Sequence, residues 1–356
     1  MNNIIRSVFA LSLALVAVNI TQAQSSPSTK AGPYGAAKIS PIAGAGEAKY
    51  WDYLNFDQER GLLFASLGSH MAVINAATGK MAADITGMVR NHGVALVPSV
   101  GRGFISDGDE GSVVIFDLKT FAVLGKIKVD EDADGIQYDP VSNKVWVVAG
   151  DANSITPIAA NVDPKTGKAE SPVALGGKPE FFQMDYQGKA YVNLTDKNEV
   201  AVIDTKTAKV VARWSAAPGG GNTAMAIDRE HHRLFLGCRN PQKLIVMDAN
   251  NGRVISDCPI GEGCDAVVFD DGYVFASTRD GNLAVNHETS PGKFELLQTI
   301  PTKFWCGTMA VDPKTHTIYL PTSDFEIRPN SFARVDKGAL IKPDSFVIVT
   351  VSRSGK

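Results

Sequence analysis

The chain has 356 residues, of which 44% are hydrophobic and 21% are charged, and its formal net charge is -3 at pH 7. This composition excludes a disordered chain, because it supplies enough apolar surface for a large core. Lys and Arg are scattered along the sequence instead of gathering in one basic segment. A nucleic-acid partner is therefore not expected, since it needs a dense positive surface.

The first residues have the pattern of an export signal. Arg6 precedes an apolar run from Val8 to Val18, and Thr21-Gln22-Ala23 is typical of a cleavage site. We therefore predict a signal peptide over residues 1–23, cleavage near Ala23, and a periplasmic or secreted location. The alternative is a buried N-terminal helix. The run is too short for a transmembrane helix, which needs ~20 apolar residues, so no membrane span is expected.

A spacer and one orphan strand follow the signal. Residues 24–33 are rich in Ser, Pro, Thr and Gly, which predicts a flexible linker. Ala37 to Ile42 could form one edge strand, although no neighbouring segment offers it a partner. Residues 34–356 are expected to form a single domain, because the remaining chain is built from one repeated unit.

The repeated unit is clearest from Met184 to Val211. Ala190 to Leu194 and Val200 to Ile203 are short runs with β-branched and aromatic residues, separated by a polar turn, which predicts a hairpin. Copies of the unit are spaced 40 to 46 residues apart. The residues that end the first strand of each copy are Asp57, Val97, Asp139, Asp185, Asp228, Asp270 and Asp312. Seven four-stranded units at this period predict an all-β, seven-bladed β-propeller with antiparallel blades.

The seventh unit predicts how the ring closes. Phe346 to Val351 is its third strand, and only a turn follows it. An unpaired sheet edge favours aggregation. We therefore expect the N-terminal strand, at about residues 37–42, to complete the last blade by pairing with the C-terminal strand.

The strand motif also resembles a known family. Tyr191-Val192-Asn193-Leu194, followed by Val202-Ile203-Asp204-Thr205 and a Lys-containing turn, resembles the YVTN repeat of YncE-like seven-bladed β-propeller proteins. Many members of that family are exported bacterial proteins. The resemblance covers nearly all of residues 50–356 and implies the propeller fold. It leaves the function open, since related propellers serve as binding scaffolds, enzyme subunits and cofactor holders.

Propeller geometry brings two sets of loops to one face: those after each second strand and those that enter each first strand. At the channel mouth, one ring position holds Asp52, His92, Asp134, Glu180, Thr223, Asp265 and Gly307. A concave mouth with aromatic walls and convergent polar groups is a typical ligand site. We predict a binding or scaffold protein, expected to be a monomer, whose mouth holds a small molecule or a protein partner. The predicted ligand-binding residues are Trp51, Asp52, His92, Asp134, Glu180, Phe181, Asn222, Asp265 and Trp305.

Acidic loops on the same face suggest a cation. Asp107, Asp109 and Asp132 offer carboxylate oxygens, which suit Ca or Mg. A solvated hairpin loop and a turn are the alternative interpretation. The rival function is a lyase or lactonase assisted by a divalent cation. In that hypothesis His92 is the general base, because imidazole titrates near neutral pH, and Glu180 is a second candidate catalytic residue.

Four cysteines in an exported chain suggest pairing. Cys264 and Cys306 occupy equivalent positions in adjacent units, so a disulfide between them is a candidate. A thiolate metal site that combines both residues with His92 is the alternative.

Overall fold

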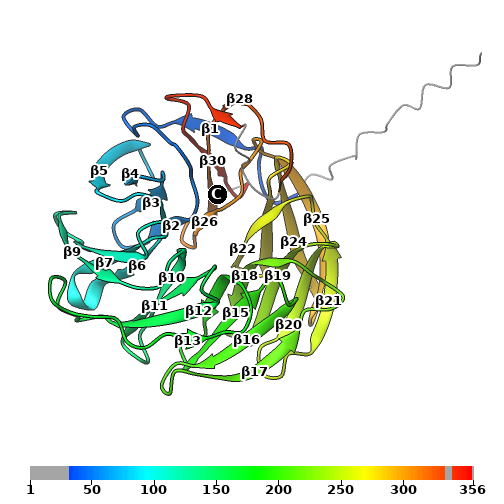
Figure 1. The fold of residues 1–356 in the computed structure, drawn as a ribbon. Coiled ribbons are helices and arrows are strands. Elements are labelled where there is room, and N and C mark those ends of the chain that lie inside the picture. Colours follow the sequence, from blue (N-terminus) through cyan, green and yellow to red (C-terminus); the bar gives the residue numbers. More distant parts are fainter. Residues whose placement is uncertain (1–31, 333–338, 355–356) are drawn as a thin grey trace, which may run out of the picture.

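The computed structural model describes residues 32–332 and 339–354, so the predicted signal peptide and most of the predicted linker lie outside the described residues. The chain forms seven four-stranded sheets in a ring around a central channel (Figure 1). Neighbouring strands within the blades run antiparallel. The predicted all-β, seven-bladed β-propeller is therefore confirmed. Within the described residues, no helix is long and apolar enough to cross a membrane.

Six blades are each built from four consecutive strands, which follow one another from the channel outward. Blades 1 to 3 consist of β2 (Leu54–Asp57), β3 (Leu62–Ser66), β4 (His70–Asn75) and β5 (Lys80–Thr86); β6 (Asn91–Val97), β7 (Arg102–Asp107), β8 (Ser112–Asp117) and β9 (Val123–Lys128); and β10 (Ala133–Asp139), β11 (Lys144–Ala149), β12 (Ser154–Ala159) and β13 (Val173–Ala174). Blades 4 to 6 consist of β14 (Pro179–Met184), β15 (Lys189–Leu194), β16 (Glu199–Asp204) and β17 (Lys209–Ser215); β18 (Asn222–Asp228), β19 (Arg233–Arg239), β20 (Gln242–Asp248) and β21 (Val254–Pro259); and β22 (Cys264–Asp270), β23 (Tyr273–Thr278), β24 (Asn282–Ser290) and β25 (Lys293–Pro301). A short 3-10 turn, η1 (Pro98–Val100), connects β6 to β7.

The seventh blade joins the two ends of the described chain, as predicted. From the channel outward it consists of β26 (Ala310–Asp312), β27 (Thr317–Thr322), β30 (Val347–Val351) and β1 (Lys38–Pro41). β1 pairs with β30 from Lys38 opposite Thr350 to Pro41 opposite Val347. A hairpin of β28 (Phe325–Ile327) and β29 (Leu340–Ile341) is inserted between β27 and β30. This insertion interrupts the repeat and was not among the predicted elements.

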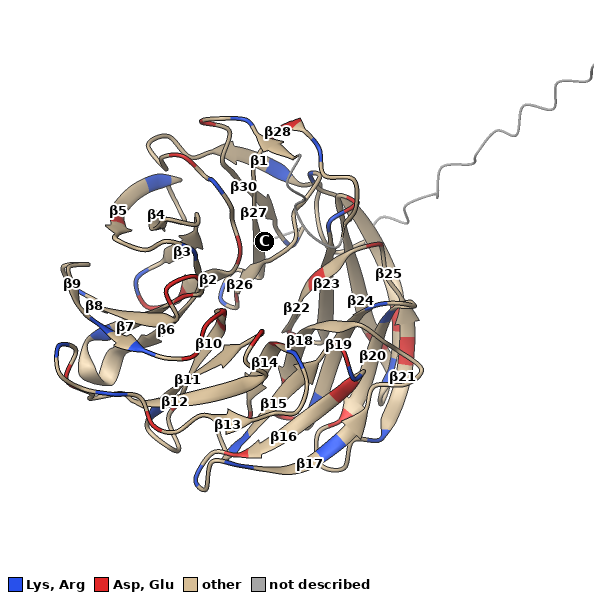
Figure 2. Cartoon of the chain, viewed as in Figure 1, with Lys and Arg blue, Asp and Glu red and all other residues tan. Residues whose placement is uncertain are grey.

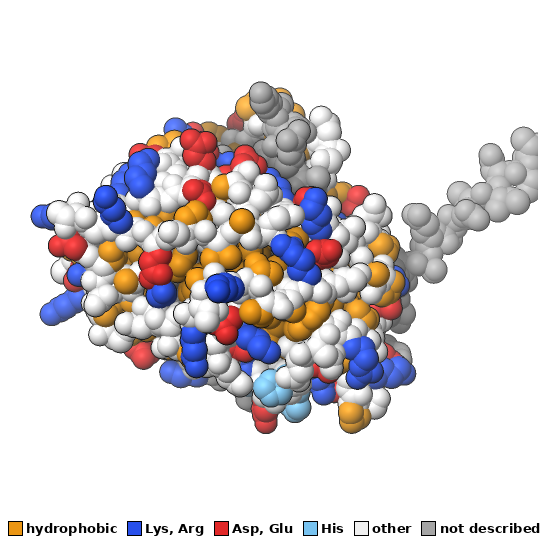
Figure 3. Space-filling view, turned by 60° about the horizontal axis from the view of Figure 1, so that its bottom comes forward, with side chains coloured by type: hydrophobic (Ala, Val, Ile, Leu, Met, Phe, Trp, Pro, Cys, Tyr) orange, Lys and Arg blue, Asp and Glu red, His pale blue; other side chains and the backbone are white. Residues whose placement is uncertain are grey.

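Burial follows the position of a strand within its blade. The inner strand β3 is buried at all five positions, whereas the outermost strand β17 alternates between exposed and half-buried residues. Apolar layers fill the space between neighbouring blades, as Trp146, Phe182 and Val192 do between blades 3 and 4. On the face in Figure 3, charged side chains of both signs lie between hydrophobic ones, as expected where outer strands meet solvent.

The recurring aspartates are turn residues. Asp57 Oδ1 accepts the backbone N–H groups of Glu59 at 3.0 Å and Arg60 at 3.1 Å. Asp139 and Asp185 accept the backbone N–H groups that follow them in the same manner. Such side-chain acceptors stabilise tight turns. The aspartates that mark the repeat therefore hold the turns on the face opposite the predicted site.

Tyr34 anchors the N-terminal segment to the ring. Its side chain is buried, and its ring packs edge-on against Phe275, with centroids 4.9 Å apart. We expect Tyr34→Ala to lower the free energy of unfolding by about 3 kcal/mol, because a buried aromatic ring is lost. Ile39→Ala changes the same segment at a side chain that is 52% exposed, so its cost should stay below about 0.5 kcal/mol. Urea unfolding measures both, and equal losses would contradict the anchoring role.

Candidate ligand site at the channel mouth

A cavity of about 720 Å³ opens at one end of the channel, among the loops that enter the first strands and those that follow the second strands. Its wall contains six carboxylates, four Lys or Arg residues, His92 and five aromatic residues. Figure 2 shows acidic positions gathered where these loops meet around the central opening. Because charges of both signs surround one cavity, each must be described with its partner.

β-bulges at the start of the first strands direct side chains of the predicted ring into this cavity. In blade 2 the pairing of β6 with β7 skips from Asn91 to Val94, and in blade 6 the pairing of β22 with β23 skips from Cys264 to Ala266. The first strands of blades 3, 4 and 5 show the same irregularity. A bulge leaves a residue out of the ladder and redirects its side chain. The unpaired residues that reach the cavity are His92, Asp134, Glu180, Phe181 and Asp265.

Eight of the nine residues predicted to bind a ligand line the cavity: Trp51, Asp52, His92, Asp134, Glu180, Phe181, Asp265 and Trp305. The exception is Asn222, and this corrects the prediction. Asn222 is fully buried, and its Nδ2 donates to Asn193 Oδ1 at 2.8 Å and to the backbone oxygen of Glu199 at 2.9 Å. Its side chain therefore ties blade 5 to the second and third strands of blade 4.

His92 lies between two carboxylates. Its Nδ1 is 2.7 Å from Asp52 Oδ2 and 3.4 Å from Asp134 Oδ1, and Tyr50 donates its hydroxyl to the same Asp52 oxygen at 2.9 Å. Burial lowers the pKa of His92, but the charge of Asp134 and the hydrogen bond to Asp52 outweigh it and raise the pKa to about 9. Asp52 is the closer of the two carboxylates, so we assign the imidazolium to it.

The other nitrogen of His92 is turned away from the cavity. Nε2 is buried and has no hydrogen-bond partner within the described part of the chain. It faces the backbone of Gly108, where an added Cβ would approach it to 2.9 Å. One ring nitrogen is therefore occupied by carboxylates and the other is enclosed, so His92 acts as a fixed positive charge.

Two carboxyl groups of the cavity have raised pKa values. Burial raises the pKa of Asp134 to about 7, and the charge of Asp52 adds to this effect although His92 opposes it. Burial, followed by the charge of Asp134, raises the pKa of Glu180 to about 8. Glu180 makes no hydrogen bond or ion pair with any residue that the structure describes. The negative charge on this side of the cavity is therefore only partly compensated.

Asp265 has the opposite environment. Arg279 donates to its Oδ2 from Nη2 at 2.6 Å and from Nε at 3.0 Å, and Arg239 Nη2 donates to its Oδ1. The Arg279 guanidinium also lies over the Trp305 ring, 4.8 Å from its centroid. Burial alone would raise the pKa of Asp265, but the charges of Arg279 and Arg239 hold it below its usual range. This side of the cavity is internally neutralised.

Sequence reasoning missed the basic residues of the site. Arg239 ends β19 and Arg279 follows β23, so both belong to the loops that were assigned to this face. Arg90 and Lys178 precede the first strands of blades 2 and 4. The loops before the first strands and after the second strands share one face. Assigning Lys and Arg residues in these loops to that face would have found all four basic residues.

The predicted cation ligands do not converge. Asp107 is buried, and its carboxylate accepts the backbone N–H groups of Val89 and Arg90. Asp109 is exposed, 3.6 Å from Arg90 Nη1, and of the three only Asp132 lines the cavity. The prediction that these three form one site is therefore wrong. Within the described residues, the group whose ligand atoms lie within 4.8 Å of one another is Asp52, His92 and Asp134.

The predicted disulfide is absent, because blade 6 separates the two thiols. Cys264 packs in the apolar layer between blades 5 and 6, and Cys306 packs in the layer between blades 6 and 7. Both residues are buried free thiols, as are Cys238 and Cys258. Burial raises the pKa of Cys264 and of Cys306. This corrects the predicted bond and also disfavours a thiolate metal site with His92.

The fold and the cavity define a β-propeller with a polar channel mouth. The chain is similar to the β-propeller domain of Cps50 (Swd1) from Myceliophteria thermophila, with a TM-score of 0.67 and 10% sequence identity. The match covers 89% of this chain and 99% of that domain. At this identity the likeness shows the fold alone.

No family model matches the chain, and a search of curated proteins also found no match. The resemblance to YncE-like proteins therefore stays a prediction.

Proposed function

We propose that the protein is a binding protein of the β-propeller class whose channel mouth holds a small molecule with a positively charged amine group. The observation that carries this proposal is Glu180, a carboxyl group that faces the cavity and has no hydrogen-bond or ionic partner among the described residues. Its pKa of about 8 keeps it mostly protonated at neutral pH, because ionising a buried carboxyl group without a partner is costly. A bound cation would remove this cost, so the site gains most from a ligand of positive charge.

The wall of the cavity supports an organic cation. Trp51, Tyr53 and Phe181 line it beside Glu180 and Asp134, and aromatic faces attract ammonium groups. The pKa values of Asp134 and Glu180 are raised, so a cation that binds there would favour their ionised forms. Asp265 adds little to this attraction, because two arginines already neutralise it.

A divalent cation is the second candidate, and the cluster of Asp52, His92 and Asp134 favours it. The metal would have to compete with the 2.7 Å contact between His92 and Asp52. The lyase or lactonase hypothesis has weaker support, because neither ring nitrogen of His92 is presented to a molecule in the cavity. Residues 1–23 remain the basis for proposing that this binding protein acts in the periplasm or outside the cell.

Fluorescence titration tests the proposal, since two of the four tryptophans, Trp51 and Trp305, line the cavity. Ethanolamine, choline and putrescine serve as probes, with Ca²⁺ and Mg²⁺ tested separately. We expect at least one amine to bind, and Glu180→Gln to weaken binding by about tenfold or more, because a charge-assisted contact is lost. Glu170→Gln, an exposed position paired with Lys144 on the outer wall, is the matched control.

The affinity for an amine is expected to increase with pH. Raising the pH from about 6 to about 8.5 ionises Asp134 and Glu180, so amine affinity should increase over this range. Binding of Ca²⁺ or Mg²⁺ without any amine would favour the second candidate. The proposal fails if no probe binds, or if Glu180→Gln and Glu170→Gln bind equally well.

A further inference from the structure

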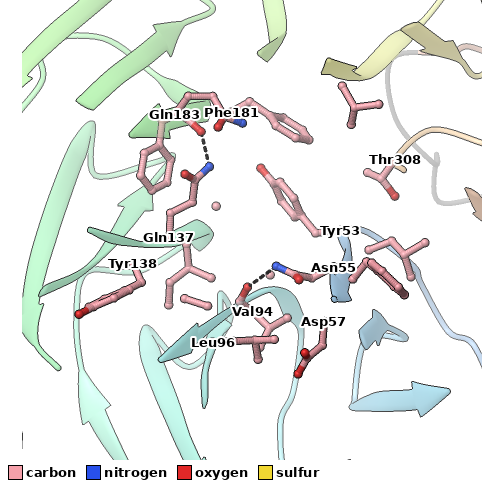
Figure 4. A pocket seen from close by; sticks show the side chains of 18 of the residues that line it. Tyr53, Asn55, Asp57, Val94, Leu96, Gln137, Tyr138, Phe181, Gln183 and Thr308 are labelled. Carbon is pink, nitrogen blue, oxygen red and sulfur yellow. Dashed lines mark hydrogen bonds between the residues drawn. The ribbon is translucent and has the colours of Figure 1, made fainter. Parts of the chain in front are cut away.

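A second cavity, of about 560 Å³, occupies the channel beyond the mouth (Figure 4). The two cavities share Tyr53, Phe181 and Thr308, so these residues form the boundary between them. The rings of Tyr53 and Phe181 are in contact, with centroids 4.6 Å apart and planes inclined by 39°. We call the second cavity the far chamber. It reaches the turns on the opposite face, at Asp57 and Glu59.

Four amide side chains line the far chamber, and three of them lie on first strands, whereas Gln58 lies in a turn. Asn55, Gln137 and Gln183 occupy the same position in blades 1, 3 and 4, two residues before the turn aspartate. Each amide nitrogen donates to a backbone oxygen of a first strand in another blade: Asn55 to Val94 at 3.2 Å, Gln183 to Met225 at 3.1 Å, and Gln137 to Phe182. Figure 4 shows the bonds of Asn55 and Gln137.

These bonds determine what the amides offer to a ligand. Because one N–H of each amide is bound to the wall, its carbonyl oxygen and its second N–H are left for the chamber. None of the three oxygens accepts a hydrogen bond from a described residue. The far chamber therefore presents a set of oriented acceptors to donors such as hydroxyl groups.

The remaining wall carries few charged groups and has an apolar side. The equivalent positions in blades 2 and 6 are Ala95 and Val268, and Met309 lies beside them. Among the residues that the structure describes, no Lys, Arg or His lines the chamber, and its carboxylates are Asp57 and Glu59. Asp57 is already bound to Arg60 and to its own turn. Glu59 is exposed in the turn at the outer end. Among the described residues, the interior of the chamber therefore offers no free counterion to a charged ligand, and it suits a neutral molecule.

We propose that the far chamber is a second ligand site, separate from the mouth, and that it binds a neutral hydroxyl-rich ring such as a sugar. The hydroxyl groups would donate to the oxygens of Asn55, Gln137 and Gln183. The C–H face of the ring would pack on Tyr53 and Phe181, since aromatic rings supply a large flat contact area. A volume of about 560 Å³ lies within the ~300–1,000 Å³ of small-molecule sites.

Calorimetric titration of the full chain with glucose, galactose, maltose, cellobiose and myo-inositol tests this inference. Gln183→Lys keeps a donor for the Met225 backbone oxygen and removes the acceptor, while Val268→Phe fills the apolar side of the chamber. Both should weaken binding of the sugar by about tenfold or more, because an acceptor or the space for the ring is lost. Gln187→Lys makes the same charge change in an exposed turn outside the chamber and should bind like the unmodified protein.

The expected result is saturable binding of at least one sugar, weakened by both chamber variants and unchanged by Gln187→Lys. The inference is overturned if no member of the panel binds, or if binding persists in the chamber variants. Melting temperatures establish which variants are folded, and if one chamber variant fails to fold the other decides the question. Because the probes are uncharged, a failure here is independent of the amine titration at the mouth.

Discussion

Asp265→Ala is expected to lower the free energy of unfolding by about 3 kcal/mol or more, because it leaves two arginines without their shared carboxylate. Asp265 is 7% exposed and accepts from both Arg239 and Arg279. The low pKa of Asp265 indicates that its ionised form is favoured in the folded protein. Asp265→Asn should be milder, since the amide keeps the shape and one acceptor but not the charge. Urea unfolding measures both losses.

Asp257→Ala is the matched control. Asp257 forms an ion pair with Lys243 on the outer strands of blade 5, where both side chains are about one third exposed. Exposed pairs of this kind contribute less than about 1 kcal/mol. If Asp265→Ala lowers the free energy of unfolding no more than Asp257→Ala does, the Asp265 carboxylate does not stabilise the two arginines on this side of the cavity.

The stability of the protein is expected to fall as the pH rises from about 6 to about 9. The folded pKa of His92 is about 9, above its ordinary value of 6.5. A raised histidine pKa gives stability that is complete below the unfolded pKa and is lost as the pH passes the folded pKa. For His92 this loss is on the order of 3 kcal/mol. The raised pKa values of Asp134 and Glu180 act in the same direction, because their ionised forms are disfavoured by burial.

Denaturant unfolding at several pH values tests this expectation. In His92→Gln the free energy of unfolding should fall less steeply with rising pH, because the imidazolium that faces Asp52 and Asp134 is then absent. His232→Gln, in an exposed turn, should leave the decline unchanged. An equally steep decline in His92→Gln would mean that other groups set the pH dependence.

Periodicity predicted the fold well, because a propeller repeats its local interactions. The aspartates that mark the period are turn acceptors, so their spacing reports the length of each blade directly. The pairing of β1 with β30 also followed from counting strands. The β28–β29 hairpin was missed because it breaks the period, and a pattern built from repeats gives no signal for an insertion.

The candidate site was predicted in part. The ring position follows from the repeat, and the cavity contains six of the seven residues that occupy it, all except Thr223. Asn222 was wrongly included because it directly precedes the ring position of blade 5, whereas its own side chain points into the blades. The disulfide between Cys264 and Cys306 was wrongly predicted because the two thiols lie on opposite sides of blade 6, although they occupy equivalent positions in the sequence.

By itself, the sequence determined the number of blades, the face that carries the loops after the second strands and before the first strands, and the ring of polar residues at the channel mouth. These features depend on residue spacing, which a repeated unit makes regular. Tertiary structure decided which charges are paired: His92 with Asp52, Asp265 with two arginines, and Glu180 with no described residue. It also divided the channel at Tyr53 and Phe181. Such pairings depend on the direction of each side chain across several blades, and spacing along the chain does not contain that information.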